Sequence, residues 1–465
     1  MKFKELFKTK EFKIFLTVWI IYVFYFSDIG GAHSDSAAAL TVSIVDNHTL
    51  SIESYKNHSN VINFAYYKGK FYSGIAPGAS FLAAPLYIMF KPLISPFYIL
   101  DYSPSIINLV AVVLISSLLL SAVASALTSV LLYRLLKYFI KQEKKRLFLT
   151  FIFSFGTLYF LYSTAYEPVL IAAFFSFFAF YLLFKFKYKE LSYKIVFFAG
   201  FLSAIAVTIH YLMFILAFFQ FVYFLSFSRN MKRTFLYLLG TMIPMILLMY
   251  YHFYIFDSPF KTGYHHLYAV DITNEYADPT KAHFPIFKNL WGLSFSPFKG
   301  YFFFMPITLL SLYGIFWHIF RKSVYKTDIS FCFLFFLSSF LLNASLEHWN
   351  AGCSYGPRYL IPTIPFMFVI IGGLMEHLKG IYVYLLGSTS VFINYLSALY
   401  GRNCVGYNDI FNVYLPALFS KGFSEYIPLI IFSTYFIRIP SYLITLLHLL
   451  GILLLSLLIY LIWRK

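Results

Sequence analysis

Residues 106–133 read IINLVAVVLISSLLLSAVASALTSVLLY, a stretch without a single charged side chain. A helix needs roughly 20 apolar residues to cross the hydrocarbon core of a bilayer, so this stretch predicts a transmembrane helix. The rest of the chain has the same character, because 60% of its 465 residues are hydrophobic and only 12% are charged. A soluble domain keeps about 25% charged residues. The composition therefore excludes a soluble globule and predicts an integral membrane protein.

Apolar stretches of crossing length recur along the remaining sequence. The longest, 194–227, exceeds one crossing and is expected to break near His210. With that break, the sequence predicts an all-α polytopic membrane protein of about twelve transmembrane helices, forming one domain over residues 1–465. The other predicted crossings are 12–32, 147–164, 167–184, 194–210, 211–227, 233–256, 298–320, 329–346, 359–377, 381–400 and 440–463.

In the predicted topology, the basic residues behind the net charge of +17 are concentrated on one side of the membrane. With the N-terminus in the cytoplasm, the cytoplasmic segments carry 24 of the 36 Lys and Arg residues but only 6 of the 19 Asp and Glu residues. This separation follows the positive-inside rule, so no nucleic-acid partner is needed to explain the charge. We expect a multi-pass protein of the cell membrane with both termini cytoplasmic. The cytoplasmic segments are 1–13, 134–147, 185–194, 229–233, 321–328, 376–380 and 464–465.

Three long segments, 33–105, 257–297 and 401–439, fall on the outer side in this topology. Long ordered loops usually carry function, because a rigid scaffold positions them. Asn47 and Asn57 fit the glycosylation sequon, which agrees with an outer location. The chemistry is therefore expected on the outer face.

The first outer segment has three recognisable parts. The alternating stretch SDSAAALTVSIVD (34–46) predicts a short amphipathic helix at the interface. The apolar run FLAAPLYIMFKPLI (81–94) contains two prolines and is expected to lie along the membrane surface. Between them, the turn FYSGIAPGAS (71–80) could present backbone N–H groups to a phosphate, or could simply lead into the next helix.

Asp35 is the first candidate for chemistry, in the stretch GGAHSDSAA. A carboxylate flanked by small residues can approach a substrate hydroxyl closely and act as a general base. The alternative is a helix cap, since Ser34, Asp35 or Ser36 could accept from the first turn of the expected helix.

Arg358 lies in EHWNAGCSYGPRYLIP (347–362), the densest polar cluster of the chain. A guanidinium there could bind a lipid phosphate bidentately, or could snorkel to the interface with a topological role. Trp349 and Tyr359 could flank a sugar or a lipid chain, or could be interface aromatics.

Two further outer positions carry polar side chains. His265 and His266 are adjacent, so they point to different sides of a helix or strand and make a poor metal pair. Glu167, beside Pro168, could favour the dipole of the following helix or could serve function. No metal site is expected.

The three cysteines, Cys332, Cys353 and Cys404, give neither metal spacing nor a disulfide framework. Cys353 and Cys404 both fall on the outer side and could pair. Unpaired thiols are the default expectation.

Four motifs occur in order along the chain and resemble one family. The membrane glycosyltransferases of the C-type fold, the GT-C family, carry similar blocks after a large first loop with an acidic residue. The likeness is to the branch of the protein O-mannosyltransferases and the bacterial aminoarabinose transferases of lipid A. The blocks are YSGIAPGASFLAAPLY (72–87), FDSPFKTGY (256–264), GLSFSPFKGYFFFMP (292–306) and WNAGCSYGPRYLIPTIPF (349–366).

This chain departs from its relatives at two points. Relatives often carry an Asp–Lys pair where Gly74 and Ile75 stand, which leaves Lys68 or Lys70 to supply a cation. The first-loop acid sits in His-Ser-Asp-Ser instead of an Asp-Glu pair.

The resemblance implies a mannosyltransferase-like enzyme that moves a sugar from a polyprenyl-phosphate donor to an acceptor hydroxyl or phosphate, with inversion. The acceptor could be protein, lipid or glycan. Neither a metal ion nor another cofactor is implied, and the remaining partners are membrane lipids. The implied base is Asp35; the implied donor-phosphate contacts are Arg358, Tyr72, Ser73 and Lys70; the implied substrate contacts are His265, His348, Trp349, Tyr359 and Glu167.

Two alternatives to an enzyme stay open on the sequence alone. A transporter or lipid flippase would commonly show inverted repeats and polar groups near the membrane midplane, whereas the polar residues of this chain gather at the outer interface. A noncatalytic scaffold would keep the fold and lose the base.

We predict that a cysteine introduced at Lys70 reacts with a membrane-impermeant maleimide on intact cells, because the first long segment lies outside. With the native Cys332, Cys353 and Cys404 replaced by serine in both variants, a cysteine at Glu143 should stay unlabelled until the cells are opened. The opposite pattern would reverse the predicted topology.

Overall fold

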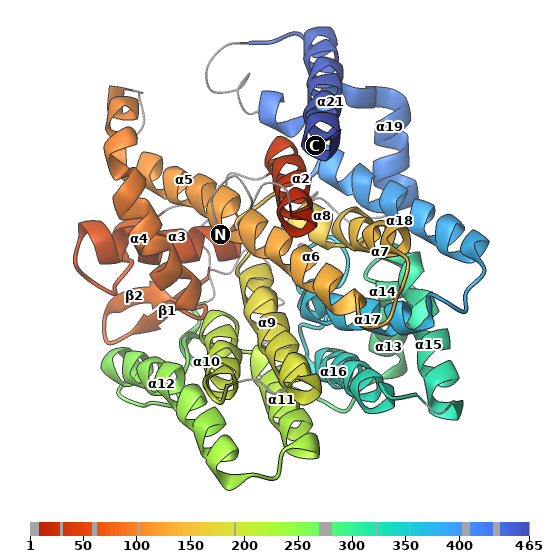
Figure 1. Ribbon diagram of the computed structural model, residues 1–465. Helices are drawn as coiled ribbons and strands as arrows, with labels where there is room; N and C mark the ends of the chain where they lie inside the picture. The colour runs from red at the N-terminus through yellow and green to blue at the C-terminus, as the bar shows by residue number, and fades with distance from the viewer. Residues whose placement is uncertain are drawn as a thin grey trace.

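The computed structural model describes residues 9–27, 31–57, 63–99, 103–189, 192–268, 281–321, 323–352, 354–401, 410–430 and 438–464. Within these ranges the protein is helical, with a single two-stranded hairpin (Figure 1). The expected all-α architecture is therefore confirmed. Cys353 and Cys404 lie outside the described residues, and Cys332 is buried with a free thiol.

The helices coincide in large part with the predicted crossings. The α-helices are α2 (Lys10–Phe24), α3 (Ala32–Asp46), α4 (Gly78–Phe90), α5 (Pro104–Ser116), α6 (Ala122–Leu136), α7 (Glu143–Phe155), α8 (Tyr159–Tyr162), α9 (Pro168–Tyr188), α10 (Lys194–Ile209), α11 (Met213–Phe227), α12 (Met231–Phe256), α13 (Phe287–Ser294), α14 (Tyr301–Phe304), α15 (Leu309–Phe320), α16 (Lys326–Ser345), α17 (Ile364–Leu374), α18 (Gly380–Tyr400), α19 (Leu415–Lys421) and α21 (Ser441–Arg464). Shorter helical turns are η1 (Glu53–Tyr55), η2 (Lys91–Leu93), η3 (Ser95–Ile99), η4 (Ser117–Ser121), η5 (Gly263–His266), η6 (Pro306–Thr308), η7 (Arg358–Thr363), η8 (Ile410–Tyr414) and η9 (Gly422–Glu425).

Six helical segments of the described chain are long and apolar enough to cross a membrane: Pro104–Leu136, Pro168–Tyr188, Met231–Phe256, Lys326–Ser345, Gly380–Tyr400 and Ser441–Arg464. Several of the other predicted crossings fall on shorter apolar helices, such as Lys194–Ile209, Met213–Phe227 and Pro306–Phe320. The count of twelve crossings stays a prediction.

The break expected near His210 is confirmed. Helix α10 ends at Ile209, His210 has extended backbone, and α11 begins at Met213. Two short antiparallel helices thus replace one long one, and His210 lies at the turn between them.

Helices α10 and α12 meet through two glycines. A Cβ at Gly200 would overlap the carbonyl oxygen of Tyr237, and a Cβ at Gly240 would overlap that of Phe197. Small residues let transmembrane helices approach closely where lipid gives no hydrophobic driving force. This contact fixes the distance between the two helices.

A buried carboxylate ties three helices at the end that the sequence places in the cytoplasm. Asp328 of α16 is fully buried and accepts hydrogen bonds from Lys187 Nζ at 2.9 Å, Tyr188 Oη at 2.6 Å and Tyr223 Oη. Its lone pairs are satisfied within the protein, as burial of a charge requires.

The segment after α2 folds into α3, the hairpin and α4. The helix expected over 34–46 exists, but its expected amphipathic character is wrong, because residues 34–43 of α3 are all buried. Its position at the membrane interface stays a prediction. Its serines and alanines are small enough to pack closely against α4 and α5, and small side chains are what such burial demands.

The hairpin was not expected from the sequence. Strands β1 (Phe64–Tyr67) and β2 (Lys70–Ser73) pair through a two-residue turn in which Lys68 and Gly69 both have positive φ. Such a turn matches the right-handed twist of the strands. The alternating stretch NFAYYKGKFYS carried this signal.

The helix expected over 81–94 is also present, as α4 followed by η2, and α4 runs through Pro85. Phe81, Ile88, Met89 and Leu93 are exposed apolar side chains on it. Its position along the membrane surface stays a prediction.

We predict that Gly240→Val destabilises the protein by about 1–3 kcal/mol, because the added side chain must force α10 and α12 apart. Thermal unfolding in detergent measures the effect. Leu239→Val, at an exposed position of the same helix, is the matched control. Equal melting temperatures for the two variants would contradict a tight glycine contact.

Candidate functional site

Asp35 is a buried carboxylate without a partner. It is fully buried, and neither of its oxygens has a hydrogen-bond partner among the described residues. Because desolvation disfavours the charged form, burial raises the pKa of Asp35 to about 7. A carboxylate with a pKa near neutrality is suited to accept and release a proton.

The alternative explanation of Asp35 as a helix cap is wrong. The residue at the N-cap of α3 is Gly31, and no side chain caps this helix. Ser34 donates to the Gly31 carbonyl at 2.9 Å, and Ser36 bonds Asn63 and Ser73. Asp35 therefore lies in the first turn without a capping role.

A second buried charge, Arg358, faces a small cavity. Its Nη1 lies 3.8 Å from Glu167 Oε2, and its Nη2 donates to the Ala351 carbonyl at 3.4 Å. Both distances are long for a guanidinium, which carries five donors. The cavity of about 20 Å³ is lined by Arg358 and Glu167 with His33, Ile75, Ala76, Pro168, Ile209, His210, Tyr211 and Tyr264. We call it the Arg358 cavity.

Asp35 and this cavity are linked through α3. His33, two residues before Asp35, lines the cavity, and Asn63 bonds its Nδ1 at 3.0 Å. Burial, together with the positive charge of Arg358, holds the pKa of His33 well below its usual range. The imidazole is therefore neutral at physiological pH.

Lys299 supports the loop that precedes Arg358. Its buried ammonium donates to the carbonyls of Gly352, at 3.1 Å, and Ser354, and to the Ser354 hydroxyl at 2.7 Å. Ala351 has a positive φ, which is strained for a residue with a Cβ, whereas Gly352 adopts its positive φ without strain. Lys299 and Arg358 hold this loop from two sides.

Glycines also bring the sequence motifs together. A Cβ at Gly263 would overlap the backbone of Gly74, and a Cβ at Gly78 would overlap Thr208 of α10. The turn 74–78 is thus clamped between the block after α12 and the end of α10. This close approach requires glycine because no side chain fits.

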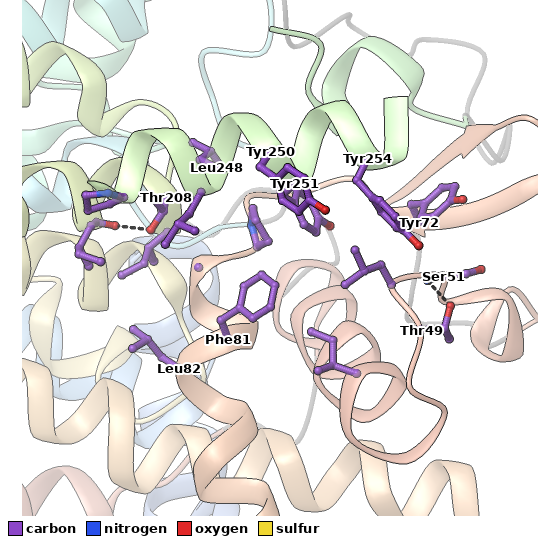
Figure 2. A pocket seen from close by; sticks show the side chains of 18 of the residues that line it. Thr49, Ser51, Tyr72, Phe81, Leu82, Thr208, Leu248, Tyr250, Tyr251 and Tyr254 are labelled. Carbon is purple, nitrogen blue, oxygen red and sulfur yellow. Dashed lines mark hydrogen bonds between the residues drawn. The ribbon is translucent and has the colours of Figure 1, made fainter. Parts of the chain in front are cut away.

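A larger groove lies on the other side of that turn (Figure 2). It has a volume of about 780 Å³. Figure 2 shows Tyr251 and Tyr254 reaching into it from α12 and Tyr72 from the hairpin. We call it the tyrosine groove; its lining is Ile44, His48, Thr49, Leu50, Ser51, Lys70, Tyr72, Pro77, Gly78, Phe81, Leu82, Ile205, Thr208, Ile209, Pro244, Leu247, Leu248, Tyr250, Tyr251 and Tyr254.

The structure places the expected donor-phosphate contacts in two different cavities. Arg358 lines its own cavity, whereas Lys70 and Tyr72 line the tyrosine groove. Ser73 is buried and bonds Ser36 at 2.9 Å, so it ties β2 to α3.

The expected substrate contacts are also spread out. Tyr359 lies 6.2 Å, ring to ring, from His210, and Trp349 packs on Phe298 and over Gly292. His348 is half-buried, and burial together with Arg358 and Lys299 lowers its pKa.

His265 occupies a different position from these residues. Its exposed ring bonds Thr262 in a local capping box at the start of η5. It lines neither of the two cavities.

Sequence reasoning missed three residues of the site. Lys299 stood inside a motif block but within a predicted crossing, and His33 was quoted only as a neighbour of Asp35. His210 served only to divide 194–227. Their histidine and lysine side chains in apolar surroundings were the available signal.

We predict that Asp35→Asn raises the melting temperature at pH 8. The native carboxyl has a pKa of about 7 against an ordinary value of 3.8, so its charged form destabilises the fold increasingly as pH rises between these values. The difference corresponds to at most roughly 4 kcal/mol at pH 8. The gain should vanish below about pH 3, where the carboxyl is protonated in both the folded and the unfolded state. An equal gain at both pH values would contradict the desolvation argument.

Comparisons with known proteins bear on the fold. No family model matches the chain, and no curated protein matches it in sequence. The solved structure of ArnT from Cupriavidus metallidurans bound to undecaprenyl phosphate is similar, with a TM-score of 0.51 and 11% identity, covering 96% of this chain and 76% of that one.

The oligosaccharyltransferase AglB from Archaeoglobus fulgidus, solved with an inhibitory peptide and a dolichol-phosphate, also matches. It has a TM-score of 0.48 and 11% identity, covering 86% of this chain and 56% of that one. With the likeness to ArnT extending over nearly its whole length, the chain has the fold of the GT-C membrane glycosyltransferases.

Proposed function

We propose that this protein transfers a sugar from a polyprenyl-phosphate donor to an acceptor hydroxyl or phosphate at the outer face of the cell membrane, with both termini in the cytoplasm. The observation that carries the proposal is the poorly satisfied Arg358 beside the helix that bears the unpartnered Asp35. The site thus offers a cation for a phosphate and a base for a proton. The GT-C fold supports it, as does ArnT, which was solved with undecaprenyl phosphate.

Arg358 is the proposed clamp for the donor phosphate. A buried guanidinium whose contacts among the described residues are long gains strongly from a bidentate anion. The cavity beside it has about 20 Å³, so a phosphate enters only when neighbouring side chains move apart. Glu167 is the charged side chain that has to move away from Arg358, because its carboxylate competes with an incoming anion for the guanidinium.

Asp35 is the proposed base. Its carboxylate takes the proton of the acceptor hydroxyl as the oxygen attacks the anomeric carbon from the face opposite the phosphate. The glycosidic oxygen bond breaks, the configuration inverts, and polyprenyl phosphate leaves with the electron pair. Arg358 stabilises the negative charge that develops on the phosphate, and one such contact contributes about 2.7–4 kcal/mol.

The remaining expected residues have places in this proposal. Tyr359 lies beside both Arg358 and His210 and is a proposed sugar contact. His348 and Trp349 lie just before the loop that Lys299 contacts, whereas the position of His265 gives it no contact with either cavity. A mannosyl group is the sugar that the sequence resemblance favours.

We expect Asp35→Asn to lower transfer at least about 10²-fold, because the amide cannot take the proton. The assay uses the full chain in detergent, a radiolabelled polyprenyl-phosphate mannose and a membrane extract as acceptor source. Asp46→Asn is the matched control, since Asp46 bonds Tyr87, Lys91 and Asn108 at the far end of α3. Unchanged transfer by Asp35→Asn would refute the base. In proteoliposomes, movement of intact donor across the bilayer without transfer would instead favour a flippase.

We expect Arg358→Gln to weaken binding of undecaprenyl phosphate about tenfold or more, because the neutral side chain loses the charge-assisted contact. Thermal-shift titration of the full chain with this lipid measures the affinity. Arg146→Gln, at the opposite end of the helices, is the control. Equal affinity for the Arg358 variant would contradict the clamp.

A further inference from the structure

A third cavity lies at the other end of the helices, away from Arg358. It has a volume of about 590 Å³ and lies between α2, α6 and α9, where α6 packs against both other helices (Figure 1). Helix α9 reaches both cavities, since Pro168 lines the Arg358 cavity and Tyr181 lines the third one. Because an α-helix rises about 1.5 Å per residue, these two positions are roughly 20 Å apart. We call the third cavity the Arg134 groove; its lining is Thr9, Glu11, Phe12, Phe15, Leu127, Val130, Leu131, Arg134, Phe174, Phe178 and Tyr181.

The Arg134 groove has a polar end and an apolar end. The three helices place polar lining residues at the same level: Arg134 Nε lies 3.7 Å from Glu11 Oε1, and the guanidinium interacts with the Tyr181 hydroxyl. About two helical turns away from this level, the lining contains Leu127 on α6 and Phe174 on α9. The groove therefore matches a molecule with a polar head and an apolar chain.

Cations outnumber carboxylates at the polar end. Glu11 is the carboxylate of the described lining, and Lys137 donates to it at 2.7 Å. The side chain of Arg134 is 48% exposed, and its ion-pair contact with Glu11 is long. On α9, the Nζ of Lys185 lies 6.0 Å from the ring of Tyr181, and this lysine has no ion-pair partner among the described residues. Charge complementarity therefore favours an anionic ligand.

The polar end lies where the apolar helices reach their boundary. Arg134 directly follows the uncharged stretch 106–133, and Lys185 begins the basic segment 185–194. Apolar stretches of crossing length match the hydrocarbon core of a bilayer. The polar end is therefore expected at the level of the lipid phosphates, and the apolar end within the hydrocarbon. In the predicted topology this is the cytoplasmic side.

These features favour a lipid over a soluble anion. A soluble anion fits only the polar end and leaves Phe15, Leu127 and Phe174 without a partner in the groove. A lipid covers both ends, and basic pockets between transmembrane helices on the cytoplasmic side are sites where anionic head groups bind. The polyprenyl phosphate of the proposed function approaches from the outer side, so the lipid expected here is a phospholipid of the other leaflet.

We propose that the Arg134 groove binds one anionic phospholipid of the cytoplasmic leaflet. The phosphate lies between Arg134 and Lys185, and an acyl chain lies against Phe15, Leu127 and Phe174. The inference goes beyond the proposed function, because it needs no sugar donor. A lipid that bridges α2, α6 and α9 binds only the folded chain, so it raises the stability of the protein by mass action.

The test uses the full chain in a nonionic detergent, titrated with phosphatidylglycerol or phosphatidylcholine, with thermal unfolding as the readout. We expect phosphatidylglycerol to raise the melting temperature and phosphatidylcholine to leave it unchanged. Arg134→Gln should weaken phosphatidylglycerol binding about fivefold, as loss of one cation beside an anionic head implies, and Lys185→Gln should do the same. Arg321→Gln is the matched control, because this arginine lies at the end of α15 and outside the groove lining.

A second pair of variants probes the apolar end. Leu127→Trp should fill the groove and abolish the rise in melting temperature that phosphatidylglycerol causes. Leu114→Trp, at an exposed position of the same helical span, should keep that rise. An independent readout uses the unsubstituted chain and a phosphatidylglycerol with a photoreactive group in its acyl chain. Mass spectrometry should then find the crosslinks on 127–134 and 174–181.

Four results would overturn the inference. Equal stabilisation by phosphatidylcholine, insensitive to Arg134→Gln, would exclude a site for an anionic head. Equal stabilisation by glycerol phosphate, which has no acyl chain, would leave a site for a soluble anion only. An equal loss of undecaprenyl phosphate affinity in Arg134→Gln would assign the groove to the donor. Crosslinks confined to other helices would place the phospholipid elsewhere.

Discussion

Lipid offers no hydrogen-bonding partner to a polar group, and the arrangement of this protein follows from that constraint. Charged side chains inside a membrane are costly unless they are paired or face a cavity. At one end, Asp328 is satisfied by a lysine and two tyrosines. At the other end, Asp35 and Arg358 are buried with far fewer contacts. The same constraint thus separates a fully paired charge from two charges with few partners among the described residues.

The packing around Asp35 and Arg358 compensates for the free-energy cost of burying these two charged side chains. Arg358 and Lys299 donate to the carbonyls of Ala351 and Gly352, and Ala351 is held there at a positive φ. Strain of this kind persists where the surrounding structure over-determines it, and it is common at functional sites. Burial also raises the pKa of Asp35. A carboxyl that is kept away from water lowers the stability of the fold, a cost that functional sites often carry.

Close backbone approach divides the outer region into two cavities. Gly78 lies against α10, and Gly74 lies against Gly263. The turn between β2 and α4 therefore lies between the Arg358 cavity and the tyrosine groove. The cavity on one side of this turn is charged and small, and the groove on the other side is amphiphilic and open toward the exposed surface of α12.

Composition and charge pattern in the sequence determined the helical membrane class, the break at His210 and, through the four motif blocks, the GT-C fold. These features depend on local hydrophobicity and on the order of residues, and both can be seen in the amino-acid sequence itself. Only the tertiary structure decided that α3 is buried and that Lys70 and Tyr72 stand apart from Arg358. It also brought His33, His210 and Lys299 to the site. Burial and cavity boundaries arise from contacts between segments far apart in the chain, and no local pattern in the sequence encodes them.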